Sequence, residues 1–267
     1  MSRPRVTLYL DVVSPYTRVA FEVLKRYEEP WDIELVFKAV SLRAVMDECG
    51  NHGPTMGISQ KRNQTIKDVS RATQYYDVTL NSPPSFPFPT RPAQLLLRHL
   101  SDHPSPSVQA KYVKAIEACF TATWTTHAPL GNAEQVQSAV SSVWGQDGQD
   151  ELKKLIEESS TPEMVERQER EGKALVNEGG AYGFPWMTVE KDGTTSTWFG
   201  LDRFDLRSSV ALCRDNLLAD AYLPSTTANG RRSRQRVEGT LPRRPSATDQ
   251  GSPRSPEGSE PRVSAVR

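Results

Sequence analysis

The residues best suited to chemistry lie where an apolar segment gives way to a helix. Residues 6–10 are mostly apolar and predict a strand, and Ser14 and Pro15 follow them closely. Serine is a preferred N-cap residue, and proline suits the first helical position, where its missing N–H group would have no partner. The pair therefore places a hydroxyl group at the positive end of a helix dipole, a favourable position for an anion. Many such pairs act only as helix caps, so a purely structural role stays open.

The elements around this pair form a β-α-β unit. The helix carries apolar residues with the i, i+3, i+4, i+7 spacing of a buried face, namely Tyr16, Val19, Ala20, Val23, Leu24 and Tyr27. Residues 32–38 then alternate, with Ile33, Leu35 and Phe37 on one side, which predicts a half-buried strand. If the two strands pair in parallel, the crossover between them is right-handed.

Helical periodicity dominates the middle of the chain. The pattern predicts helices over residues 61–76, 91–100, 107–124 and 133–144. In the first of these helices, one face is expected to carry Ile66, Val69, Ala72 and Tyr76. Thr161 and Pro162 form a cap and a first-turn proline for a further helix, which ends at Gly179-Gly180.

The chain then returns to β structure. Residues 186–190 and 195–199 predict two strands, and Asp192-Gly193 between them is a strong signal for a hairpin turn. A final amphipathic helix is expected over residues 204–217. The element order predicts an α/β fold, a thioredoxin-like domain with an all-helical insertion. An unrelated α/β domain followed by a helical bundle is the less economical alternative.

These elements divide the chain into three parts. Residues 5–40 and 180–220 form the split thioredoxin-like domain, and residues 41–179 form the inserted helical domain. The segment from 224 to 267 is rich in Arg, Pro and Ser and has few large apolar side chains. Such a composition cannot offset its chain entropy by burial, so this tail is expected to be disordered. A role of its arginines in targeting or in binding an acidic partner stays open.

Composition excludes several classes of function. The 33 basic and 33 acidic residues balance, so the chain has no overall field that attracts nucleic acid or a membrane. No apolar run approaches the ~20 residues that span a bilayer. The three cysteines are far apart, form no C-x-x-C pair and accompany no apolar leader. These features predict a soluble protein of a reducing, intracellular compartment. The cytoplasm is favoured, with mitochondria and peroxisomes left open.

The histidines do not predict a metal site. His99 and His103 have helical spacing, but residues 101–106 predict a loop, so the two rings are not expected to share a helical face. No bound metal is therefore expected.

Three separated motifs carry a resemblance to known proteins. The first is Asp11-Val12-Val13-Ser14-Pro15-Tyr16, and the second is Gly50-Asn51 followed by Pro54, Lys61 and Asp68. The third joins Tyr182-Gly183-Phe184-Pro185 to Phe199-Gly200-Leu201-Asp202-Arg203. In order and spacing these motifs resemble the kappa-class glutathione transferases and their bacterial relatives, the 2-hydroxychromene-2-carboxylate isomerases. The resemblance covers about residues 5–220 and implies the DsbA-like branch of the thioredoxin fold.

The resemblance implies that glutathione is a co-substrate and that Ser14 is the catalytic residue. Ser14 stands where disulfide oxidoreductases of this fold carry a cysteine, and Thr17 stands where a second cysteine would follow, so no internal disulfide can form there. The Ser14 hydroxyl is expected to stabilise the thiolate of bound glutathione for attack on an electrophile. The implied glutathione-binding residues are Ser14, Pro15, Tyr16, Asn51, Phe184, Pro185, Leu201 and Asp202.

Individual roles also follow from the resemblance. Phe184 is expected to offer its backbone to the tripeptide, ahead of a cis peptide bond to Pro185. Asn51 is expected to contact the tripeptide, and Asp202 to face its γ-glutamyl amine. Leu201 departs from the usual Ser or Thr, which leaves only a backbone contact at that position. Each residue also has a plain structural interpretation, as a turn residue or a cap.

The implied function is that of a kappa-type glutathione transferase acting on a small electrophile or peroxide. The alternatives are a glutathione-dependent isomerase of an unsaturated aromatic acid and a non-catalytic binding protein. An anionic substrate would need a basic pocket, for which Arg18, Lys61 and Arg62 are the candidates. The implied partners are the small-molecule electrophile and a second copy of the chain, with neither nucleic acid nor a membrane.

Overall fold

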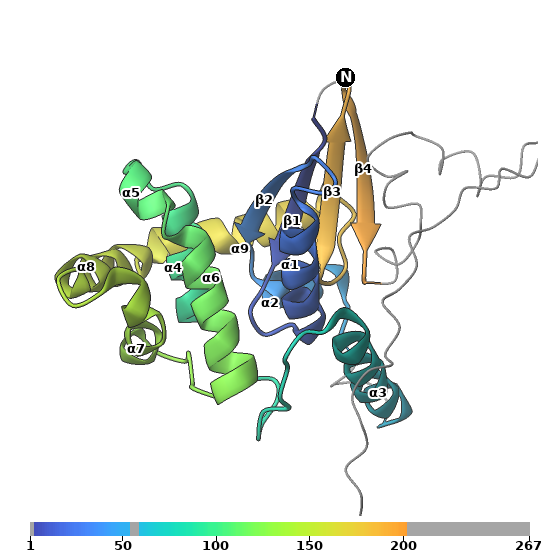
Figure 1. Cartoon of the computed structure of the whole chain (residues 1–267), viewed down its shortest axis with the longest axis horizontal. Helices are drawn as coiled ribbons and strands as arrows, with labels where there is room; N and C mark the ends of the chain where they lie inside the picture. The colour runs from blue at the N-terminus through green and yellow to red at the C-terminus, as the bar shows by residue number, and fades with distance from the viewer. Residues whose placement is uncertain (1–2, 54–58, 202–267) are drawn as a thin grey trace, which may run out of the picture. The chain divides into compact units, whose positions relative to one another are not determined.

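The computed structural model of the chain describes residues 3–53 and 59–201. Asp202, the helix expected at 204–217 and the arginine-rich segment from residue 224 lie outside the described residues. The described part contains a sheet with the strand order β2-β1-β3-β4, with helices on both of its faces (Figure 1). None of the described helices is long and apolar enough to cross a membrane.

The strands pair as the β-α-β unit and the hairpin predict. β1 (Arg5–Leu10) pairs in parallel with β2 (Glu34–Ala39), and Leu10 lies opposite Ala39. On its other side β1 pairs antiparallel with β3 (Trp186–Lys191), which pairs with β4 (Thr194–Phe199). In the hairpin turn Asp192 and Gly193 both have positive φ, 49° and 79°, as the expected two-residue turn requires. The sheet therefore places the first and last parts of the described chain side by side.

Different helices cover the two faces of the sheet, because consecutive residues of β1 point to opposite sides. Leu8 and Leu10 belong to the larger core cluster, together with Phe21 of α1 (Pro15–Tyr27). Tyr9 packs against a smaller cluster that includes residues of α2 (Leu42–Cys49) and α9 (Pro162–Asn177). In Figure 1, α1 crosses in front of the sheet and α9 passes behind β2.

The apolar stripe predicted for α1 is confirmed except at its end. Val19, Ala20, Val23 and Leu24 are buried, whereas Tyr27 is 36% exposed and stacks on Trp31 with the ring centroids 4.3 Å apart. Phe21 extends the buried face, since its ring lies 4.8 Å from that of Phe37 and 5.5 Å from that of Phe120. α1 thus packs both on the sheet and on the helical part, the helices between β2 and β3.

The helices of the middle segment match the sequence prediction in part. α3 (Ser59–Tyr76), α4 (Arg91–Ser101), α7 (Ala133–Trp144) and α9 form where expected. However, α3 buries no side chain, and Ile66 on its expected apolar face is 58% exposed. The expected helix over residues 107–124 is divided into α5 (Pro106–Gln109), α6 (Tyr112–Thr121) and a π-helix, η1 (Ala122–Thr126). The pattern also misses α2 and α8 (Gln149–Ser159).

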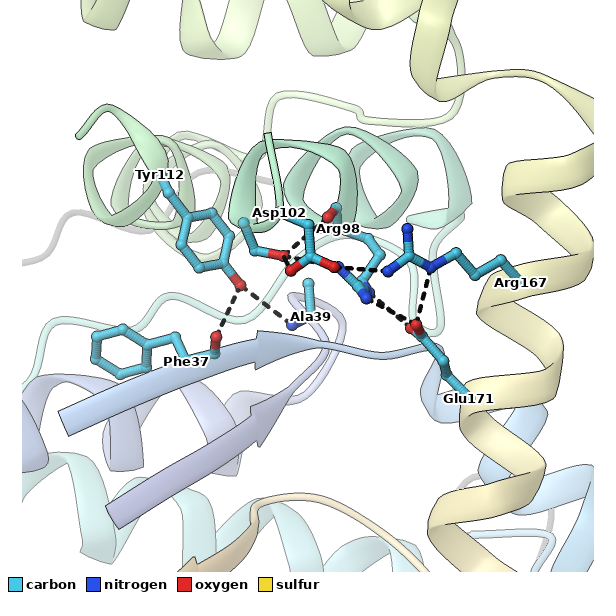
Figure 2. Close-up of polar contacts among 8 residues, drawn as sticks. Phe37, Ala39, Arg98, Asp102, Tyr112, Arg167 and Glu171 are labelled. Carbon is cyan, nitrogen blue, oxygen red and sulfur yellow. Dashed lines mark hydrogen bonds and ion pairs between the residues drawn. The ribbon is translucent and has the colours of Figure 1, made fainter. Parts of the chain in front are cut away.

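Four charged side chains join α4 to α9 (Figure 2). Arg98 binds Glu171 through two hydrogen bonds of 2.6 and 2.7 Å and pairs with Asp102 at 2.7 Å. Arg167 lies 2.6 Å from Asp102 and 3.1 Å from Glu171. Burial opposes the charged carboxylates, but the arginine hydrogen bonds and charges outweigh it and lower the pKa of both acids. The ring of two cations and two anions therefore clamps the two helices together.

A buried tyrosine attaches α6 to the end of β2. The Tyr112 hydroxyl donates to the Phe37 carbonyl at 3.3 Å and accepts from the Ala39 N–H at 3.2 Å (Figure 2). Burial raises the pKa of this phenol, so it stays protonated and can serve as both donor and acceptor. Ala39, the last residue of β2, is therefore held in place by α6.

Candidate functional site

Ser14 lies at the carboxyl end of β1, where the chain enters α1. The residue is 4% exposed, and its Oγ accepts a hydrogen bond from the Thr17 N–H at 3.2 Å, as the predicted N-cap requires. Pro15 is the first residue of the helix. On its other side the Ser14 Oγ lies 3.5 Å from the carbonyl oxygen of Phe184, which is a long hydrogen bond. The Ser14 hydroxyl therefore has only a weak acceptor for its own proton within the described residues.

The structure brings Phe184 and Pro185 of the third motif to Ser14. The Phe184–Pro185 peptide bond is cis, and Phe184 itself is 5% exposed. The Pro185 carbonyl accepts from the Gly200 N–H at 3.1 Å, which places Leu201 next to this loop. Leu201 is buried, and its carbonyl accepts from the Tyr76 hydroxyl at 3.2 Å. Within the described residues, no acceptor is found for the Phe184 N–H.

Asn51 holds the segment that precedes Phe184. Its Nδ2 donates to the Tyr182 carbonyl at 2.6 Å, and its Oδ1 accepts from the Gly53 N–H at 2.9 Å. Gly50 before it ends α2 in the left-handed conformation, with φ of 70°. The Cys49 thiol lies 3.8 Å from the same Tyr182 carbonyl. Asn51 of the second motif therefore lies beside Tyr182 of the third, although it already uses its amide within the protein.

Tyr16 faces α3 and not the Ser14 hydroxyl. Its hydroxyl donates to the Thr65 carbonyl at 3.4 Å. Burial and, secondarily, the charge of Asp68 raise the pKa of this phenol, so it remains protonated. Tyr16 thus connects the start of α1 to α3.

Asp11 is a buried carboxylate that fixes the loop before Ser14, and the sequence reasoning did not assign it a role. Its Oδ1 accepts from the Val13 N–H at 3.1 Å and from the Thr90 hydroxyl at 2.9 Å, and its Oδ2 accepts from the Leu42 N–H at 2.9 Å. Burial raises the pKa of Asp11, and these hydrogen bonds act in the opposite direction. One side chain therefore links the Ser14 loop to the starts of α2 and α4.

Trp124 is the second residue that sequence reasoning missed. Its indole N–H donates to the Val12 carbonyl at 2.8 Å, so η1 holds the Ser14 loop from the side of the helical part. The rings of Phe86 and Phe88 lie 5.8 and 5.5 Å from the Trp124 ring, and Phe86 is 41% exposed. An aromatic cluster of Phe86, Phe88 and Trp124 thus adjoins the loop that carries Ser14.

The basic residues considered for an anionic substrate lie in different settings. Arg18 follows Ser14 by one helical turn, but its guanidinium is 2.8 Å from the Glu22 carboxylate and 5.5 Å from the Phe120 ring centroid. Burial lowers the pKa of Arg18, and the Glu22 charge partly opposes this. Lys61 and Arg62 lie on the exposed surface of α3. The Arg18 charge is thus already paired within the protein.

Among the described residues, no cysteine lies at the start of α1. Thr17 is fully buried three residues after Ser14, and Cys119 is fully buried with a pKa raised to about 12 by that burial. The hydroxyl of Ser14 can donate a hydrogen bond to an incoming anion, and the first turn of α1 can add its dipole. The site is therefore suited to stabilising a ligand's anion. It cannot form an internal disulfide, because Ser14 and Thr17 carry no sulfur.

Comparison with known proteins is consistent with this geometry. A model of the DSBA-like thioredoxin domain matches residues 5–210. Glutathione S-transferase kappa 1 of Caenorhabditis elegans is 27% identical over 210 residues, which cover 76% of this chain and 88% of that protein. A structure of 2-hydroxychromene-2-carboxylate isomerase matches with a TM-score of 0.60 at 23% identity, covering 81% of this chain and 100% of that one. The cytosolic disulfide reductase DsbM from Pseudomonas aeruginosa, solved with GSH, matches with a TM-score of 0.50 at 13% identity, covering 82% and 100%.

The two structural matches establish the fold, a thioredoxin-like sheet with a helical insertion. The sequence match to a glutathione S-transferase kappa is distant, and it extends over most of both chains. The domain match runs from the first strand to beyond the last described residue. The chain therefore belongs to the DSBA-like thioredoxin domain family.

Proposed function

We propose that this protein is a glutathione transferase of the kappa type, in which Ser14 stabilises the thiolate of bound glutathione. The position of the Ser14 hydroxyl carries the proposal. It is buried at the N-terminus of α1, accepts from Thr17, and has only a 3.5 Å contact for its own proton. A sulfur anion placed there would accept a stronger hydrogen bond from the hydroxyl than the Phe184 carbonyl accepts now.

The energies are sufficient for thiol activation. A free thiol has a pKa of about 8.5, and each unit of lowering requires about 1.4 kcal/mol of preference for the anion. A hydrogen bond to a charged group contributes about 1.5–3 kcal/mol, and the helix dipole about 0.3–1 kcal/mol. Together they lower the pKa of the bound thiol by about one to three units. With a lowering of about two units or more, most of the bound glutathione would be thiolate at neutral pH.

The loop at Phe184 supports binding of an extended tripeptide. The Phe184 N–H has no acceptor among the described residues, and its carbonyl makes only the long contact with Ser14. A peptide that pairs with both groups would add a short strand at this position. Asn51 would act by holding the loop through Tyr182. Asp202, outside the described residues, is proposed to bind the γ-glutamyl amine.

The surroundings of Ser14 favour an apolar electrophile over an anionic substrate. The aromatic cluster of Phe86, Phe88 and Trp124 adjoins the Ser14 loop through the Trp124–Val12 hydrogen bond. The basic residue nearest along the helix, Arg18, is paired with Glu22. We therefore favour conjugation of an aromatic or other apolar electrophile, by attack of the glutathione sulfur, over isomerisation of an unsaturated aromatic acid.

Calorimetric titration of the full chain with glutathione tests the proposal. Titrations near neutral pH, in two buffers of different ionisation enthalpy, report the number of protons released on binding. Release of protons is expected, because binding would convert the thiol to the thiolate. S-methylglutathione is the matched control, since it retains the tripeptide but has no thiol proton to release. Absence of binding at millimolar glutathione, or binding without proton release, would contradict the proposal.

A further inference from the structure

Two histidines and a glutamate meet at one corner of the helical part, away from the Ser14 site. His99 lies in the last turn of α4, His103 lies in the turn that follows, and Glu158 lies in the last turn of α8. One possible ligand atom from each residue lies within 4.8 Å of the others. The helix does end before His103, as the sequence indicates, but the turn returns the ring of His103 to within 5.3 Å of the His99 ring. The two rings therefore do not share a helical face, as expected, but the turn still brings them together.

The spacing of these groups fits a transition-metal dication. The His99 Nε2 lies 3.3 Å from the Glu158 Oε2. Two ligands that each lie about 2.0–2.1 Å from a tetrahedral ion are about 3.3 Å apart. The other carboxylate oxygen of Glu158 pairs with Lys154 at 3.6 Å, which leaves Oε2 to face the histidine. Imidazole and carboxylate together are a ligand set that zinc-like ions accept.

The helices around this corner also favour a cation. α4 and α8 both end here, so each presents the negative end of its dipole and its last carbonyl groups. All three side chains are partly exposed, so an ion can reach them and a water molecule can take a fourth position. We infer that His99, His103 and Glu158 form a binding site for a zinc-like dication, which links the C-terminal ends of α4 and α8.

Metal binding has a defined local consequence at Ser105. The His103 Nδ1 accepts a hydrogen bond from the Ser105 N–H at 3.1 Å. A neutral imidazole that binds metal through one nitrogen carries its proton on the other. Coordination through Nδ1 displaces the Ser105 N–H, and coordination through Nε2 puts a proton on Nδ1, which then cannot accept. Either mode removes this hydrogen bond, so the Ser105 amide reports on occupancy.

The site is separable from the glutathione chemistry. Thr90, which contacts Asp11, and His99 lie at opposite ends of α4, about 14 Å apart at the helical rise per residue. Loss of the metal should therefore leave glutathione binding unchanged. Failure of the glutathione proposal would in turn leave the metal result standing.

Titration of the full chain with Co²⁺, in buffer without glutathione, tests the inference. The expected spectrum has the visible bands of a low-symmetry site with nitrogen and oxygen ligands, and no thiolate-to-metal charge-transfer band. His99→Gln and Glu158→Gln are each expected to weaken binding at least about tenfold, since even loss of a residue that only supports a ligand has such an effect. His127→Asn is the matched control, because His127 lies outside the cluster at a position with φ of 58°, which asparagine tolerates.

A second measurement guards against variants that disturb the fold. In the unaltered chain, Co²⁺ should broaden the amide resonance of Ser105 and those of its neighbours, and diamagnetic Zn²⁺ should shift the Ser105 resonance. A thiolate charge-transfer band, affinity unchanged in both Gln variants, or a Ser105 resonance unaffected by Zn²⁺ at millimolar concentration would each overturn the inference.

Discussion

Replacement of Ser14 by alanine separates the two roles of its hydroxyl, as a helix cap and as a hydrogen-bond donor to sulfur. The cap accepts from Thr17 at 3.2 Å, and its loss is expected to destabilise the fold by about 0.5–2 kcal/mol. For a chain of this size each kcal/mol corresponds to a change of about 2–4 °C in Tm. Loss of the donor raises the pKa of the bound glutathione thiol by about one to two units, from about 1.5–3 kcal/mol of charge-assisted hydrogen bonding.

Ser41→Ala provides a matched control for the cap. Ser41 caps α2 and accepts from the Ala44 N–H, also at 3.2 Å, but among the described residues its hydroxyl makes no hydrogen bond to the Phe184 loop. Both variants are expected to lose similar thermal stability in calorimetry. Only Ser14→Ala should change the ultraviolet titration of bound glutathione thiolate, and Ser14→Thr, which keeps a hydroxyl, should largely restore it.

The pH–rate profile gives the most demanding test. At neutral pH the Ser14→Ala variant is expected to turn over about tenfold more slowly, because about one to two units of pKa increase remove most of the thiolate. The profile should move to higher pH by the same interval, and the rates should converge at alkaline pH, where both forms are ionised. A uniform loss of rate at every pH, with an unchanged thiol pKa, would refute thiolate stabilisation by Ser14 and indicate a positioning role.

Three further outcomes are expected. Asp11→Asn replaces a carboxylate oxygen with an amide donor that faces an N–H, at Val13 or Leu42, and should destabilise the fold by about 1–3 kcal/mol; equal denaturant midpoints would contradict this. Glu171→Gln weakens the α4–α9 clamp and should lower Tm. Because the pKa of Glu171 and of Asp102 is lowered in the folded state, their stabilisation is present above pH ~4 and is lost as pH falls through the folded pKa values. The Tm of the unaltered chain should therefore fall more steeply than that of the variant below pH ~4, and parallel curves would contradict the assignment. Ser14→Cys should give a thiol with a pKa below ~8.5, measured as the thiolate absorbance difference from the unaltered chain, and a value at or above this would show that the helix end does not stabilise anions.

Local signals explain which parts of the fold can be predicted from the sequence. The strand, cap and proline at Ser14, the hairpin at Asp192-Gly193 and α7 depend on neighbours in sequence, and all form as expected. α2 has only eight residues, too few for a periodic pattern, and α8 is dominated by charged residues. Where the expected helix over residues 107–124 is divided, Tyr112 starts α6 and Trp124 lies in η1, and both bind partners that lie far away in the sequence.

The same difference between local and long-range signals holds for the candidate site. Ser14 is recognisable from its cap position alone, whereas Asn51 and Phe184 could be connected to it only through the resemblance between motifs. Asp11 and Trp124 gave little local signal, because their partners are backbone and hydroxyl groups in other elements. A lone carboxylate after an apolar strand, with no cation nearby in sequence, is the one hint that Asp11 offered.

The hydrogen bonds of Asp11 and Trp124 have a consequence for chimeric proteins. Because Thr90 and Trp124 reach the Ser14 loop from the helical part, that part belongs to the mechanical support of the loop and is not an interchangeable module. A graft of another family member's helices onto this sheet would have to preserve a hydroxyl at position 90 and an indole at position 124. Grafts that keep only the visible motifs would carry Ser14 on a loop without two of its attachments.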